Sequence, residues 1–234
     1  MEGKYLQILL IVILPIIIIL GTTLQVSSDS NFFNKQITSL EIINPTYVTI
    51  GVAGEITTSV VDYLKGDNEL DEELLGIRAK EHMKDVKNIR DISFYVLWII
   101  TLLFIVGILI LILTKRYERI PKILFGGGLI AAIINLLVFI FANQAFGTLW
   151  TSLHEVLFTN DLWILNPATD PLVATFTLNF FIIFLKRILL ISTILALILA
   201  IIGIIWMLVT KKEAKIHHLE IDKPKRSEER RVGK

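Results

Sequence analysis

The stretch Arg78–Trp98, reading RAKEHMKDVKNIRDISFYVLW, decides the fold. It begins with charged residues and runs, without a Pro or a Gly, into an apolar segment that starts at Phe94. We therefore predict a single helix that rises from water and becomes a membrane span. His82 and Asp85 are three residues apart and share one face of this helix. At the helical rise per residue, that face lies roughly 15–18 Å from the membrane entry at Phe94.

The composition indicates a membrane protein. Of the 234 residues, 54% are hydrophobic, and they occur in long uninterrupted runs. The chain has no cysteine, which excludes disulfides, thiol nucleophiles and thiolate metal sites. The formal net charge is +1, so bulk charge indicates no partner, and we expect no binding of nucleic acid.

Four apolar runs are long enough to cross a membrane as helices, and they cover residues 5–26, 94–114, 123–142 and 188–209. We interpret the first run as an uncleaved anchor, because it is longer than the apolar core of a signal peptide and no small-residue cleavage site follows it. The predicted fold class is an all-α membrane protein with four transmembrane helices and a small extracytoplasmic head.

The charges between the runs predict the orientation. The short loop 115–122 carries four basic residues against one acid, so the positive-inside rule places it in the cytoplasm. Residues 27–93 hold seven basic and twelve acidic residues, a net charge of −5, and form the predicted extracytoplasmic head. Residues 143–187 then form a second extracytoplasmic loop, and both termini, including the tail 210–234, are cytoplasmic. The protein is thus expected in the plasma membrane.

Several finer expectations concern these segments. Within the head, we predict a helix over residues 47–64 that ends at Gly66. We expect residues 172–185 to form a separate interfacial piece, and Asn135 to face a neighbouring helix rather than lipid. Residues 226–234 resemble the translation of a common sequencing-adapter sequence, so we interpret them as an artefact and exclude them from functional reasoning.

Two histidines fall on the outer side, each beside an acid: His82 with Asp85, and His154 with Glu155. An imidazole can act as a base near neutral pH, and a carboxylate partner fixes its tautomer. An alternative interpretation is that the same residues only order the head as polar side chains. A third interpretation is that both histidines and Asp85 are the ligands of a zinc ion, although no HExxH or similar ligand spacing supports it.

Three short motifs resemble the lipoprotein intramolecular transacylase family. They are EHMKDVK at residues 81–87, LHEVLFTNDLWILNPATD at residues 153–170, and YLKG at residues 63–66. They occur in the family's order and at matching places in the topology. The chain departs from the family pattern after Asp170, where residues 174–181 lack a Pro-Glu pair.

The resemblance implies a reaction without cofactor or metal, on diacylglyceryl lipoproteins held in membrane lipid. One acyl chain moves from the glycerol sn-2 ester to the free α-amine of the lipoprotein's N-terminal Cys, giving a lyso-form lipoprotein. The family's two histidines carry over to His82 and His154. We expect His82, oriented by Asp85, to be the base and His154 the acid, at an extracytoplasmic site. The substrate-binding residues expected beside them are Glu155, Trp163 and Asp170.

Two other functions remain open from the sequence. A metal-dependent membrane hydrolase would be sensitive to chelators. A non-enzymatic four-span assembly protein would tolerate replacement of both His82 and His154 by Ala.

Overall fold

The computed structural model describes residues 2–38 and 43–232, with side chains for residues 3–38 and 43–213. Regular structure in these residues is entirely helical, which confirms the all-α class. The four long helices are α1 (Glu2–Ser27), α5 (Ile77–Leu113), α6 (Ile120–Leu157) and α8 (Leu178–Val232). Each contains a stretch apolar and long enough to cross a membrane, which confirms the four predicted spans.

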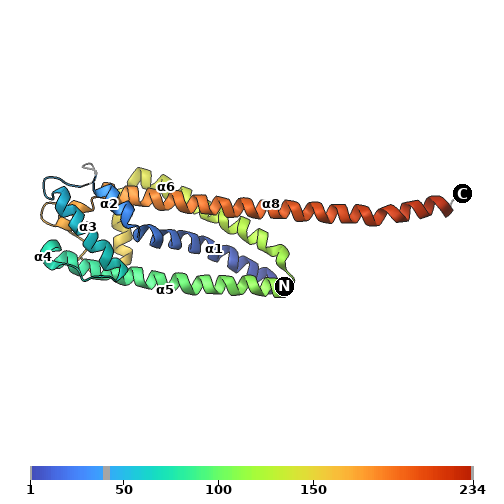
Figure 1. Ribbon diagram of the computed structural model, residues 1–234, viewed down its shortest axis with the longest axis horizontal. Coiled ribbons are helices and arrows are strands. Elements are labelled where there is room, and N and C mark those ends of the chain that lie inside the picture. Colours follow the sequence, from blue (N-terminus) through green and yellow to red (C-terminus); the bar gives the residue numbers. More distant parts are fainter. Residues whose placement is uncertain (1, 39–42, 233–234) are drawn as a thin grey trace.

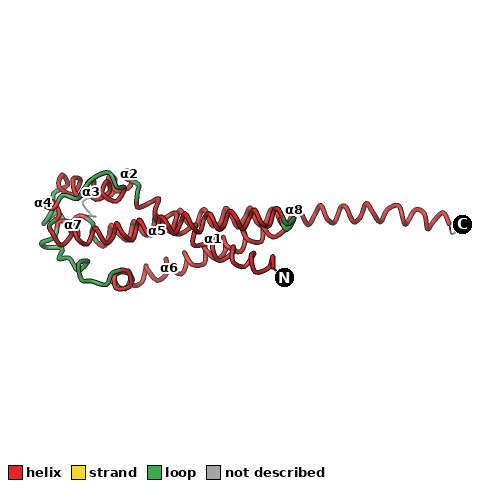
Figure 2. The backbone as a smooth tube through the Cα atoms, turned by 90° about the horizontal axis from the view of Figure 1, so that it is seen from below, coloured by secondary structure: helices red, strands yellow, loops and turns green. Residues whose placement is uncertain are grey.

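The four long helices run side by side, and the short elements gather at one end of the bundle (Figures 1 and 2). These short elements are α2 (Ser30–Ile37), α3 (Ile50–Lys65), α4 (Glu72–Leu75) and α7 (Pro171–Thr175). We call them, with the loops that join them, the cap. Both chain ends lie away from the cap, and the last part of α8 projects beyond the other helices (Figure 1).

The bundle is held by close contacts of small and polar residues. Helix α6 packs most extensively on α8, and α1 packs on α5, α6 and α8. At Gly128 of α6, an added Cβ would lie 2.5 Å from the backbone oxygen of Ala196 in α8, so only Gly permits this approach. Asn135 is buried in the same contact and donates from Nδ2 to Ser192 Oγ at 2.8 Å, so it faces a neighbouring helix as expected.

The cap shares its apolar core with the ends of the long helices. Helix α3 starts after Thr49, whose hydroxyl accepts from the Val52 N–H, and ends at Gly66, which adopts a left-handed conformation with φ of 91°. Its buried face joins one continuous cluster that includes residues from every helix of the cap and from α1, α5 and α8. The largest fully buried members are Ile56, Val61, Leu75, Val26 and Phe180.

Two boundaries differ from the prediction. Helix α6 does not end near Ala142 but continues to Leu157, with a kink at Ala145 (φ −149°, ψ 49°). The separate piece predicted over residues 172–185 is divided, because its start lies in α7 and residues 178–185 belong to α8, which is continuous from Leu178 through the fourth span. Arg187 interrupts the apolar run of the sequence but not the helix. Its guanidinium is paired with Asp29, which lies 2.6 Å from Nη2, and it stacks on the Phe32 ring, whose centroid is 4.6 Å from Cζ.

Candidate active site

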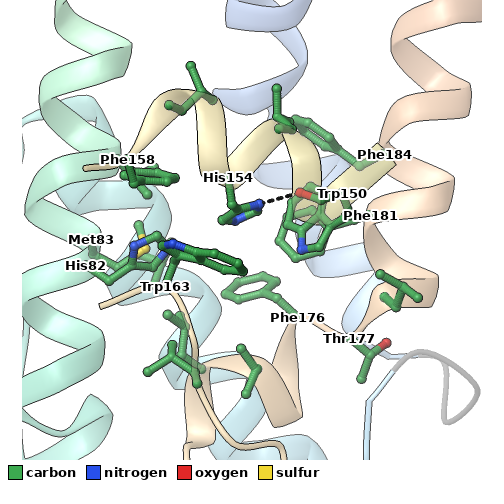
Figure 3. A pocket seen from close by; sticks show the side chains of 18 of the residues that line it. His82, Met83, Trp150, His154, Phe158, Trp163, Phe176, Thr177, Phe181 and Phe184 are labelled. Carbon is green, nitrogen blue, oxygen red and sulfur yellow. Dashed lines mark hydrogen bonds between the residues drawn. The ribbon is translucent and has the colours of Figure 1, made fainter. Parts of the chain in front are cut away.

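An apolar cavity of about 560 Å³ lies where the cap meets the long helices. Its size is within the usual range of small-molecule sites, roughly 300–1,000 Å³. Helices α5 and α6 provide the walls that carry the two histidines (Figure 3). Helices α3 and α7, the loop between α6 and α7, and the start of α8 also line the cavity. Most lining side chains are aliphatic or aromatic, among them Val60, Leu64, Met83, Val86, Leu153, Leu172, Phe176 and Phe181.

The structure brings His82 of α5 and His154 of α6 together in this cavity. Their ring centroids are 6.1 Å apart, and their side chains point toward one another from two different helices (Figure 3). Both are buried, with 7% of His82 and 8% of His154 exposed. Two residues that are 72 positions apart in the sequence thus form one pair.

The kink at Ala145 explains how α6 reaches α5. Beyond it, the last turns of α6 leave the direction of the span and run across the bundle toward α5 (Figure 1). Phe146, Trp150 and His154 follow at intervals of four residues and share the inner face of this segment. The ring centroids of Trp150 and His154 are 4.4 Å apart, so these two side chains pack against each other along this face.

The hydrogen bonds of the two imidazoles differ. His154 Nδ1 lies 2.8 Å from the backbone oxygen of Trp150. A carbonyl oxygen can only accept, so Nδ1 carries the proton and Nε2 keeps its lone pair. His82 Nδ1 is buried and has no hydrogen-bond partner within the described part of the chain. The hydrogen bond therefore fixes the orientation of His154, whereas no such bond fixes His82 among the described residues.

Both histidines lie outside the apolar stretches that cross the membrane, His82 in the charged first part of α5 and His154 beyond the kink of α6. Burial, and then the nearby His154, lower the pKa of His82 from 6.5 to about 4, against an opposing effect of Asp85. Burial also lowers the pKa of His154, against an opposing effect of the hydrogen bond to Trp150. Both imidazoles are therefore neutral at neutral pH and able to accept a proton.

Aromatic side chains enclose the pair. The ring of Phe158 is 5.0 Å from that of His82 and 5.4 Å from that of His154. The ring of Trp163 is 5.0 Å from that of His154. Neither Trp150 nor Phe158 was among the predicted site residues. Phe158 lies within the motif quoted at residues 153–170, and the sequence signal for Trp150 was the aromatic richness of residues 143–170.

The predicted acids are not at the histidines. Asp85 does not hydrogen-bond to His82, because His82 turns into the cavity while the Asp85 carboxylate accepts from Asn160 Nδ2 at 2.9 Å. Glu155 is exposed and does not line the cavity. Asp170 accepts from the Asn166 N–H at 2.6 Å and orders the loop before α7. Of the expected substrate-binding residues, only Trp163 lines the cavity.

No group of three or more His, Cys, Asp or Glu side chains that could hold a metal ion occurs within residues 3–38 and 43–213. The arrangement instead suits proton transfer. Two neutral imidazoles face an apolar space that excludes water, and there they can take a proton from one reacting atom and return it to another.

Comparisons with known proteins identify a matching family model and similar folds. Residues 8–181 match the family model of the lipoprotein intramolecular transacylase Lit. The fold is similar to a solved structure of the membrane-integral lipoprotein intramolecular transacylase Lit from Bacillus cereus, with a TM-score of 0.77 and 22% identity over 91% of this chain and 98% of that one. No curated protein sequence gives a significant match.

Two further solved structures of the Bacillus cereus protein, one with a histidine-to-arginine and one with a histidine-to-alanine substitution, also match. Each has a TM-score of 0.73 and 20% identity over 91% of this chain, and they are covered over 95% and 96% of their own length.

The buried state of His82 predicts an unusual titration. In detergent micelles, selective ¹⁵N labelling of histidine should show His82 neutral down to about pH 4, whereas an exposed histidine titrates near 6.5. The unfolded chain takes up a proton there at a higher pH than the folded chain. Stability should therefore fall as the pH drops from about 6.5 towards 4. A His82 midpoint near 6.5 would contradict the buried site.

Proposed function

The chain belongs to the lipoprotein intramolecular transacylase Lit family, and we propose that it moves the sn-2 acyl chain of a diacylglyceryl-Cys lipoprotein to the α-amine of the same Cys. The observation that carries this proposal is the pair of buried, neutral histidines inside an apolar cavity beside the membrane-crossing helices. The cavity walls suit an acyl chain, and the histidines suit the proton transfers.

The reaction needs no acyl-enzyme, because nucleophile and ester belong to one substrate. The α-amine attacks the ester carbonyl, the new C–N bond forms, and the C–O bond to the glycerol oxygen breaks. The amine loses one proton and the departing glycerol oxygen gains one, so atoms and charge balance. The product is an N-acyl lipoprotein with one acyl chain left on glycerol, which is the lyso-form.

The hydrogen bonds favour an order of proton transfer opposite to the one expected from the sequence. His154 Nε2 has a free lone pair because Nδ1 donates to Trp150, so we assign His154 to take the proton from the amine. We assign His82 to give a proton to the departing glycerol oxygen and to recover one from protonated His154, so that both imidazoles end the reaction neutral. A reference pKa near 7.7–8.0 leaves part of the amine neutral and nucleophilic near neutral pH, and His154 takes the proton that the nitrogen loses as the C–N bond forms.

The site has to lie where the substrate's lipid anchor holds the Cys, at a membrane surface. The basic loop 115–122 supports a cytoplasmic position for that loop, and it lies at the opposite ends of α5 and α6 from the histidines. We therefore propose that the cap and the cavity face the extracytoplasmic side, and that both termini are cytoplasmic.

The proposal predicts the modification state of a reporter lipoprotein. Mass spectrometry of its N-terminal tryptic peptide should show the lyso-form in cells that express the protein. His82→Ala or His154→Ala should each lower the rate at least roughly 100-fold, the usual contribution of general acid–base catalysis. His217→Ala, in the basic tail, is the matched control and should leave the product unchanged.

Two results would move the function to the alternatives. An unchanged diacylglyceryl peptide in cells that express the folded, membrane-inserted parent protein would favour a non-enzymatic assembly protein. Loss of activity on chelation, restored by added metal, would favour a metal-dependent hydrolase.

The cavity also predicts a dependence on acyl-chain length. Val86 lines the cavity, so Val86→Phe should shorten it and lower turnover of long-chain substrates roughly tenfold more than that of short-chain ones. Val156→Phe makes the same change on the outer surface, where the side chain is 83% exposed, and should not alter the preference. Equal losses for both chain lengths in the Val86 variant would place the acyl chain elsewhere.

A further inference from the structure

The loop between α6 and α7 is tied to α5 at two points that flank His82. Arg78, His82 and Asp85 follow at intervals of four and three residues and so share one face of α5. On one side of His82, the guanidinium of Arg78 donates to the backbone oxygen of Asp161. On the other side, the carboxylate of Asp85 accepts from Asn160.

The side-chain amide of Asn160 joins these parts. Its Nδ2 donates to Asp85 Oδ2 at 2.9 Å, and its Oδ1 accepts from the Leu162 N–H at 3.0 Å. The second bond closes the turn that leads directly to Trp163. One amide group therefore fixes both the turn and its distance from α5.

The tied loop carries two of the aromatic rings on the histidine pair. Phe158 precedes the turn and contacts both imidazoles, and Trp163 follows it and contacts His154. The next residues, Ile164 and Leu165, also line the cavity. A loop that left α5 would remove these side chains from the histidines and admit water to the cavity.

We propose that Asn160, with Asp85 and Arg78, forms a set of positioning residues whose hydrogen bonds hold the loop of residues 158–165 against α5. We call these hydrogen bonds the clip. They keep the aromatic side chains of the loop in contact with the two histidines. Asp85 then acts through Asn160 and the loop rather than as a catalytic partner of His82. This inference rests on the proposed function for its effect on turnover, but the clip itself is a property of the fold.

A reciprocal exchange of the two side chains tests the clip. Asn160→Asp keeps the Oδ1 acceptor for Leu162 but places a second carboxylate against Asp85. It should lower kcat roughly threefold to tenfold, the effect expected from losing one hydrogen bond of ordinary strength at an exposed position. The double variant Asp85→Asn/Asn160→Asp restores an amide–carboxylate hydrogen bond in the opposite sense and should recover most of the activity.

The double variant separates the two roles of Asp85. If the charge at position 85 served His82 directly, removing it would leave the double variant as impaired as Asp85→Asn or worse. Asn68→Asp makes the same change as the single variant in an exposed turn that does not line the cavity, and is the matched control. A single Asn160→Asp variant with full activity, or a double variant without recovery, would overturn the proposal.

Hydrogen–deuterium exchange gives a readout that does not depend on the reaction. Backbone amides of residues 158–165 should exchange faster in Asn160→Asp than in the parent protein, and should return to the parent rate in the double variant. Unchanged exchange in the single variant would overturn the clip. Absence of lyso-form from the parent protein, with the exchange pattern as expected, would instead overturn only the proposed function.

Discussion

The structure depends on two helices that are longer than a membrane is thick. Helix α5 has 37 residues, or about 55 Å at 1.5 Å per residue, whereas the hydrocarbon core of a bilayer is about 30 Å. Its charged first part must therefore extend beyond the hydrocarbon, and this part carries His82. Helix α6 has 38 residues and is also longer than a span requires. It bends at Ala145, and the segment beyond the bend places His154 next to His82. The rest of the cap packs around these two extensions.

The burial of the histidine pair sets its chemistry. Imidazoles in an apolar cavity lose the water that would stabilise their charged forms, so both stay neutral and available as proton acceptors. Such burial is costly unless polar atoms find partners, yet His82 Nδ1 has none within the described residues. The same apolar walls can receive an acyl chain, so one cavity serves both needs.

Much of this arrangement could be predicted from the sequence. Runs of apolar residues identified the four spans, since a membrane requires about 20 of them in each helix. The motifs around His82 and His154 identified the two histidines that the structure brings together. Side-chain direction was not predictable. Spacing placed Asp85 on the same face as His82, but the bond to Asn160 depends on a loop 75 residues further along the chain. Likewise, the continuity of α8 through Arg187 depends on Asp29, which lies 158 residues earlier.

The central claim is that both reacting groups belong to one substrate held in this cavity, and a crossover experiment tests it most directly. Two reporter lipoproteins with peptides of different mass, one carrying an isotopically labelled sn-2 acyl chain, are mixed with the purified protein. The account predicts that the labelled N-acyl group appears only on the peptide whose own glycerol carried the labelled sn-2 chain. The other peptide should carry only an unlabelled N-acyl group. Label distributed over both peptides would show a shared acyl-enzyme or intermolecular transfer, and would contradict the account.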